Sequence, residues 1–267
     1  MNKKHSEKGL MLVEDPEETL QALCNLANGV ITWDSFKTEY ERVTNRLRKP
    51  VDEKTIDTHF YSLTIFEILE ELDKGKYQIS LTGNDLCRLR KTKSKIYEFK
   101  SLLASILLNN PSKGKLFEKF LNFLKTPRKK SEIYEQFKPE PSRSLISWCS
   151  YSGLIEIQGK DYWSLPIHRE KISKKDFRKI LIDTYKEMRD TKMFGIKRTF
   201  VDIDDLRKNI CARLGIRIEE FDKFLTEILV REKGKLVRLF GAPSSQYDEG
   251  RNFMYKNKLY AEISLDV

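Results

Sequence analysis

The stretch that decides the fold is PSRSLISWCSYSGLIEIQGKDYWSLP, residues 141–166. Its first part carries Leu145, Ile146 and Cys149 at helical spacing and stops at Gly153. Residues 154–158 then alternate apolar and polar side chains as a strand does, residues 159–161 form a polar turn, and residues 162–165 return as a partner strand. The stretch therefore predicts a helix followed by a β-hairpin.

A second helix is expected directly before it. Ser131 is a residue type that caps helices, and SEIYEQF, residues 131–137, would turn Ile133, Tyr134 and Phe137 inward. Prolines 139 and 141 bound the turn between the two helices. This order of helix, turn, helix and hairpin resembles the winged helix-turn-helix modules of DNA-binding proteins.

The same order recurs along the chain. Asp52 caps a predicted helix from Glu53, and a hairpin turns at residues 73–76; further on, Gly215 ends a helix before a last pair of strands. We therefore expect a mainly α protein with small β-hairpin wings, built as three tandem winged-helix modules. The modules would span residues 1–95, 96–168 and 169–267, the last with a long loop in its C-terminal hairpin.

Two stretches extend the resemblance. They are YQISLTGNDLC leading into EFKSLLASILLNNP, residues 77–87 and 98–111, and SLISWCSYSGLIEIQGKDYWSL, residues 144–165. Chained in this way, they look loosely like the recognition part of type IIS restriction enzymes. That resemblance implies a role in DNA recognition, but the same architecture serves many functions.

The positive charge of the chain is concentrated in its middle. The net charge is +10. Residues 88–179 hold 22 basic and 9 acidic side chains, whereas residues 1–87 hold 11 basic and 16 acidic ones. A basic surface on the middle module predicts an anionic partner, of which double-stranded DNA is the first candidate.

Candidate DNA-binding residues follow from the winged-helix pattern, in which the second helix enters the major groove and the hairpin reaches the phosphates. On that helix we expect Ser142, Arg143, Ser144 and Ser147 on the exposed face, with Arg143 able to bind guanine and Lys160 at the tip of the wing. Phosphate contacts are expected from the start of the preceding helix and from two flanking basic runs, namely Arg128, Lys129, Lys130, Arg88, Arg90, Lys91, Lys174 and Lys175. The alternative for each is an ordinary solvent-facing residue.

The third module differs in charge. Its second helix would expose Glu219, Glu220 and Asp222, which phosphates would repel. This pattern favours a protein partner or a packing role for the third module.

Several classes of function are disfavoured. The chain has no phosphate-binding loop and no zinc-protease, dinucleotide or esterase signature, so we expect no enzyme, no cofactor and no metal site. Its cysteines are scattered singly, which predicts free thiols in a reducing cytoplasm, and no apolar run is long enough to span a membrane.

The sequence thus predicts a cytoplasmic protein that recognises duplex DNA by sequence, in transcription regulation or in a restriction-modification or defence system. A scaffold subunit whose winged helices mediate protein–protein interactions is the alternative. A nuclease with a degenerate site is a third possibility, which would require metal-dependent cutting. The DNA sequence, the protein partner and the oligomeric state are left open.

Overall fold

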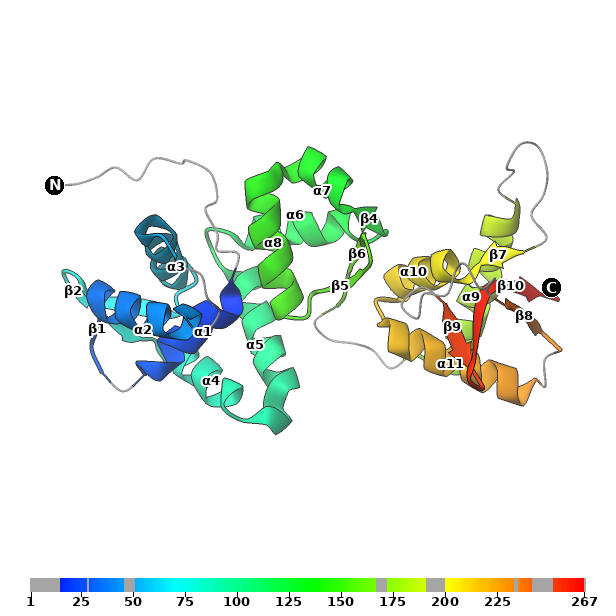
Figure 1. Ribbon diagram of the computed structural model, residues 1–267, viewed down its shortest axis with the longest axis horizontal. Coiled ribbons are helices and arrows are strands. Elements are labelled where there is room, and N and C mark those ends of the chain that lie inside the picture. The colour runs from blue at the N-terminus through cyan, green and yellow to red at the C-terminus, as the bar shows by residue number, and fades with distance from the viewer. Residues whose placement is uncertain are drawn as a thin grey trace. The chain divides into compact units, whose positions relative to one another are not determined.

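A computed structural model describes residues 15–27, 29–45, 51–166, 172–190, 200–232, 235–241 and 252–266 (Figure 1). Over these residues the protein is mainly helical, with three small sheets. The fold class expected from the sequence is confirmed at this level. Within the described residues, no helix combines the length and the apolar character needed to cross a membrane.

The first part of the chain places three helices before a hairpin. Its elements are α1 (Pro16–Asn25), β1 (Ile31–Thr32), α2 (Trp33–Asn45), α3 (Glu53–Ile65), β2 (Leu69–Asp73), β3 (Lys76–Ile79) and α4 (Leu81–Arg90). The predicted cap of α3 is confirmed, because the Asp52 carboxylate accepts a hydrogen bond from the Thr55 N–H at 2.8 Å. The hairpin turns at Gly75, whose φ of 77° suits glycine.

The middle part repeats this order with an extra helix at its start. Its elements are the short 3-10 helix η1 (Lys93–Lys95), α5 (Ile96–Asn109), α6 (Gly114–Phe123), β4 (Arg128–Lys129), α7 (Lys130–Phe137), α8 (Pro139–Tyr151), β5 (Ile155–Gln158) and β6 (Asp161–Ser164). Ser131 is not a cap as predicted, since α7 already begins at Lys130. The prolines expected in the turn form the first turn of α8, where a missing N–H costs no intrahelical bond.

The last part has the same order again. Its elements are α9 (Lys174–Asp190), β7 (Val201–Asp202), α10 (Ile203–Leu214), α11 (Ile218–Arg231), β8 (Val237–Gly241), β9 (Phe253–Tyr255) and β10 (Lys258–Leu265). Gly215 ends α10 in the left-handed conformation, as predicted. The long loop expected in the C-terminal hairpin ends earlier than predicted, because β9 forms and pairs with β10. Residues 242–251 lie outside the described residues.

The three sheets share one topology. In each, one strand precedes the last two helices before the hairpin and pairs with the final strand. The final strand also pairs with the first strand of the hairpin, giving the orders β1-β3-β2, β4-β6-β5 and β7-β10-β8. A strand, two helices and a hairpin thus occur three times along the described chain. The predicted boundaries of three separate modules stay a prediction.

By contacts the chain divides into two compact units. Residues 1–123 and 129–155 belong to one, and residues 124–128 and 156–267 belong to the other. The β5–β6 hairpin therefore falls mostly in the second unit. Its Trp163 and Leu165 are buried among the core residues of that unit, such as Phe177, Leu181 and Leu206.

An aromatic core holds the first unit together. Phe66 packs edge-on against Trp148 of α8, with ring centroids 4.9 Å apart, and also lies against Phe117 of α6. Trp148 and Leu145 have no exposed surface. Both side chains therefore lie in the interior of this unit.

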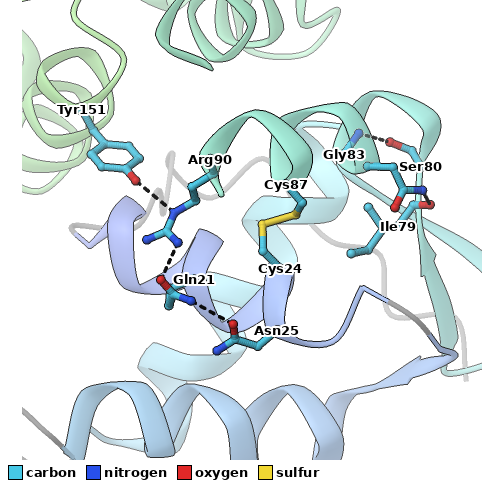
Figure 2. Close-up of a disulfide and its surroundings, with 10 residues drawn as sticks. Gln21, Cys24, Asn25, Ile79, Ser80, Gly83, Cys87, Arg90 and Tyr151 are labelled. Atoms are coloured by element: carbon cyan, nitrogen blue, oxygen red, sulfur yellow. Dashed lines mark hydrogen bonds between the residues drawn. A yellow bond between two sulfur atoms is a disulfide. The ribbon is translucent and has the colours of Figure 1, made fainter. Parts of the chain in front are cut away.

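A disulfide corrects the prediction of free thiols at Cys24 and Cys87. Their sulfur atoms are bonded, joining α1 to α4 across 63 residues of sequence (Figure 2). Both cysteines are buried, so helix packing rather than sequence proximity brings them together. Cys149 and Cys211 are free and buried, as expected for small apolar residues in helices. A disulfide is typical of an oxidising environment and gives no support to the expected reducing cytoplasm.

Candidate nucleic-acid interface

The α7–α8 pair is built by local interactions around a sharp turn. The Glu132 carboxylate accepts a hydrogen bond from the Lys129 N–H at 2.7 Å, which satisfies one free donor at the start of α7. Lys138 then takes a φ of 64°, an uncommon value for a residue other than glycine, and reverses the chain between the two helices. The two helices therefore follow one another directly and pack against each other.

Two serines that we expected on the exposed face of α8 are buried. Ser142 has no exposed surface, and its hydroxyl donates to the Lys138 and Ile133 carbonyl oxygens; the bond to Ile133 measures 3.3 Å and joins α8 to α7. Ser144 is 2% exposed. Helical geometry explains the error, because Ser142 lies three residues before the buried Leu145, on the same face. The predicted exposure of Ser142 and Ser144 was wrong.

Arg143 and Ser147 point away from this core. Arg143 is exposed and Ser147 is partly exposed, as expected for two residues one turn apart on the outer face of α8. The outer face of α8 therefore presents one long cationic donor with a small side chain beside it.

A tyrosine joins this face to α7. Lys130 and Arg143 both hydrogen-bond the Tyr134 hydroxyl, and the Lys130 ammonium also lies 5.4 Å from the centre of the Tyr134 ring. Desolvation acts to raise the pKa of Tyr134, but the two cations outweigh it and hold this pKa below its ordinary value. The result is a cluster of two positive charges and a phenol spanning α7 and α8, which we call the Tyr134 cluster.

Sequence reasoning missed Tyr134, which we expected to face inward with Ile133 and Phe137. Those two are buried, but Tyr134 is only partly buried. The signal was present in the spacing, since Tyr134 lies four residues after Lys130 and therefore on the same helical face.

Arg128 and Lys129 form β4, directly before this cluster in the sequence. Lys129 is exposed and Arg128 is partly exposed. Of the residues predicted to contact phosphate at the start of α7, Lys129 and Lys130 lie in the first unit, and Arg128 is grouped with the second.

The basic run that begins in the last turn of α4 serves partly to hold the fold together. Arg90 donates hydrogen bonds to the Tyr151 hydroxyl of α8, at 3.4 Å, and to the Gln21 side chain of α1 (Figure 2). Arg88 pairs with Asp85 at 2.8 Å, and Lys91 is exposed at the end of α4. Arg90 thus holds helices together, which its place in a basic run did not indicate.

The remaining predicted residues lie in the second unit. Lys160 is exposed at the turn of the β5–β6 hairpin, as expected for a wing tip, beside Gly159 with a φ of 58°. Lys174 pairs with Glu227 of α11 at 2.5 Å, and Lys175 is exposed one residue later at the start of α9. Lys174 therefore forms an ion pair between α9 and α11, whereas the adjacent Lys175 faces solvent.

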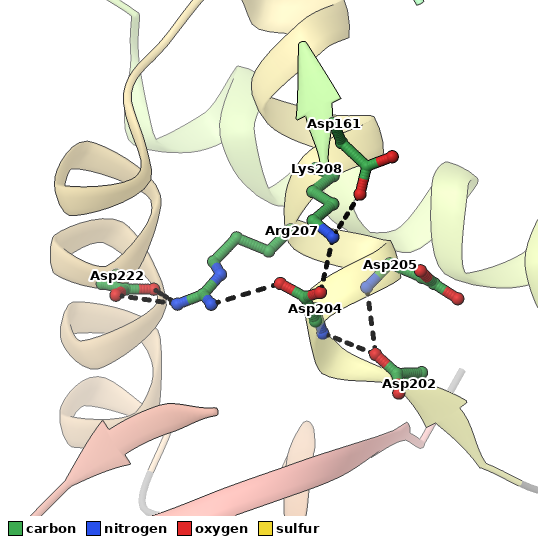
Figure 3. A network of polar contacts seen from close by, with 7 residues as sticks. All are labelled: Asp161, Asp202, Asp204, Asp205, Arg207, Lys208 and Asp222. Carbon is green, nitrogen blue, oxygen red and sulfur yellow. Dashed lines mark hydrogen bonds and ion pairs between the residues drawn. The ribbon is translucent and has the colours of Figure 1, made fainter. Parts of the chain in front are cut away.

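A network of buried charges corrects the expectation for the third repeat. Asp222 of α11 does not stand free on the surface, because its carboxylate contacts the Arg207 guanidinium at 3.2 Å (Figure 3). Arg207 is 2% exposed and also contacts Asp204 at 3.4 Å. Desolvation raises the pKa of Asp222, although Arg207 acts in the opposite direction. Asp222 thus serves packing, one of the two roles we expected.

Glu220 also serves the fold. Its carboxylate accepts a hydrogen bond from the Arg217 N–H at 2.9 Å, at the start of α11, while Glu219 is exposed. Only one of the three acidic residues expected on this helix surface is therefore fully available to solvent.

Three carboxylates gather near the start of α10, in an arrangement that could suit a metal ion. Asp202, Asp204 and Asp205 have oxygen atoms within 4.8 Å of one another. Asp202, however, accepts hydrogen bonds from the N–H groups of Asp204 and Asp205, and Asp204 pairs with Arg207 and Lys208 (Figure 3). These contacts account for the cluster as a helix cap and an ion network.

Comparison of the chain with protein families, with curated proteins and with solved structures finds no significant match.

Proposed function

We propose that this protein binds double-stranded DNA through the outer face of α8 and the start of α7. The Tyr134 cluster carries the proposal, since it places two cations and a phenol across the α7–α8 pair. Arginine can bind the edge of guanine in the major groove, and lysine and tyrosine are common phosphate contacts. Arg143 would contact bases, while Lys130 and Tyr134 would contact the backbone.

The topology supports a winged-helix assignment. A strand, two helices and a hairpin, with the first strand paired to the last, is the order expected of that module, and it occurs three times. In such a module α8 is the helix that enters the groove. We therefore infer three tandem winged-helix repeats, of which the middle one reads DNA.

Charge separates the middle repeat from the first. The hairpin of the first repeat exposes Glu70, Glu71 and Asp73, which phosphates would repel. In the middle repeat, exposed cations lie instead before the hairpin, with Lys129 on β4, Lys130 on α7 and Arg143 on α8. This difference favours DNA contact at α8 over contact at α3.

A scaffold role is the second candidate, and a specific observation favours it. The β5–β6 hairpin contributes Trp163 and Leu165 to the core of the second unit, so much of this hairpin is occupied by packing. A hairpin used in this way would offer DNA its exposed turn, at Lys160.

The test is duplex binding at several salt concentrations. The charge-reversal variant of Lys129 and Lys130 should weaken binding to all sequences and should reduce the log–log salt slope by about 0.9 for each phosphate that the protein no longer neutralises. Lys54→Glu is the matched control, because Lys54 is exposed on α3 of the acidic repeat. An unchanged slope in the double variant, or an equal change in the control, would remove α7 from the interface. Absence of duplex binding by the unaltered protein would leave the scaffold role.

A further inference from the structure

A groove lies in the first unit, away from the Tyr134 cluster in sequence. It has a volume of about 590 Å³ and runs between the end of α3, the start of α4 and one face of α5. Its lining includes Phe66, Leu81, Leu102 and Ile106, together with Glu67 and Glu70. All of these residues belong to the same compact unit.

The apolar side chains of this groove are unusually open to solvent at its rim. Leu81, the first residue of α4, is 87% exposed. Leu102 and Ile106 lie one turn apart on α5 and are partly exposed. The buried Phe66 and Leu69 form the floor between them. Exposed apolar side chains that gather in one groove beside polar residues are typical of a binding site.

The groove is held in place by the core and by hydrogen bonds. Phe66 packs on Trp148, and the Asn110 amide donates to the Ile65 carbonyl at 2.7 Å. On the opposite side, the Ser80 hydroxyl donates to the Glu67 carbonyl at 2.8 Å. A site already formed in this way loses little free energy to ordering when it binds.

The negative charge of the groove favours a positively charged binding partner. Its two charged lining residues, Glu67 and Glu70, are both acidic and exposed, and no lysine or arginine is among the described residues that line it. Glu71 and Asp73 extend the acidic edge along β2. Such a surface repels phosphate and attracts a cationic partner.

We propose that this groove binds a protein partner through an amphipathic helix, with apolar side chains facing Leu81, Leu102 and Ile106 and with lysines or arginines facing Glu67 and Glu70. The spacing of Leu102 and Ile106 matches the ridge that a second helix packs against. The site does not depend on the DNA interface, because its charge is opposite and its residues are separate.

Two labelled peptides test the proposal on the full-length protein, by fluorescence anisotropy. Both carry leucines along one helical face; one has lysines on the remaining faces, and the other has glutamates there. We expect the lysine peptide to bind and the glutamate peptide to bind at least about tenfold more weakly, a difference of about 1.4 kcal/mol.

Matched variants locate the binding. Leu81→Lys should weaken binding of the lysine peptide about tenfold. Tyr97→Lys should leave it unchanged, since Tyr97 is 77% exposed on α5 and does not line the groove. Glu70→Lys should also weaken it. Both leucine and tyrosine are exposed, so neither change should disturb folding, which thermal unfolding checks.

Other outcomes would overturn the proposal. Equal binding of the two peptides, no binding of either, or equal effects of Leu81→Lys and Tyr97→Lys would each exclude this groove as the site. Weaker binding by Glu70→Lys with unchanged binding by Leu81→Lys would indicate surface charge alone. Self-association that Leu81→Lys abolishes, measured by sedimentation, would make a second copy of the chain the occupant instead.

Discussion

The Lys208 ammonium of α10 contacts the Asp161 carboxylate of β6 at 2.6 Å, which ties the β5–β6 hairpin to the last repeat (Figure 3). Lys208 also contacts Asp204 at 2.7 Å. Desolvation acts to lower the pKa of Lys208, but its bonds to Asp161 and Asp204 outweigh this effect and raise the pKa. The hairpin of one repeat is therefore part of the structure of the next.

Replacing Lys208 with methionine should destabilise the second unit by about 3 kcal/mol, because Asp161 and Asp204 would lose their shared cation in a mostly buried site. Since the folded-state pKa of Lys208 is raised, its contribution is present at neutral pH and is lost only as the pH rises beyond the ordinary value of 10.5. Urea unfolding followed by fluorescence measures the effect. Lys160→Met, in the exposed turn of the same hairpin, is the control. Equal stability of the two variants would contradict the structural role of Lys208.

Replacing Cys24 and Cys87 together with serine should lower the free energy of unfolding of the first unit by about 4 kcal/mol. The disulfide closes a loop of 63 residues, and a loop of this length restricts the unfolded chain by about that amount. Thermal unfolding with and without reductant measures it. The unaltered protein should become less stable on reduction, while the double variant should not respond.

Thiol titration of the protein unfolded without reductant is an independent check on this bond. It should detect Cys149 and Cys211 but not Cys24 or Cys87. Four reactive thiols would restore the expectation drawn from the sequence.

The stability of the first unit should fall as the pH drops below the ordinary pKa of histidine. His59 is 1% exposed, and its Nδ1 lies 2.6 Å from the Thr19 hydroxyl; burial lowers its pKa from 6.5 to about 3. The folded state keeps the ring neutral while the unfolded state takes up a proton. The stabilising contribution is therefore complete above pH 6.5 and is lost as the pH falls toward 3.

The expected slope from this one group is at most about 1.4 kcal/mol per pH unit. Denaturant unfolding at pH 7 and at pH 5 measures it, in a range where most carboxylates have not yet been protonated. His59→Gln will lower stability at both values but should flatten the slope. A slope that the variant leaves unchanged would assign the pH dependence to other groups.

Arg143→Ala should distinguish sequence-specific DNA binding from a scaffold role. If α8 enters the major groove, removal of a guanine contact should cost about 1 to 3 kcal/mol on a selected duplex and much less on a scrambled one. Binding to both duplexes is measured at one salt concentration. Equal weakening on the two duplexes would make Arg143 a phosphate contact, and no weakening on either would favour a scaffold.

The sequence by itself determined the local elements and the distribution of charge. The helix cap at Asp52, the helix end at Gly215 and the hairpin after Gly153 were predictable, because each depends on the backbone preferences of adjacent residues. The outward direction of Arg143 and Ser147 also followed from helical spacing. The same spacing, applied to Ser142, would have placed it on the buried face with Leu145.

Only the tertiary structure decided which distant residues meet. The bonds between Cys24 and Cys87, between Arg207 and Asp222 and between Asp161 and Lys208 join elements far apart in sequence. Their partners depend on how helices pack, and a lysine or aspartate has the same local preferences whether it faces solvent or a buried counter-ion. For this reason the charge pattern predicted where positive residues lie along the chain, whereas packing determined which of them hold the protein together and which face outward.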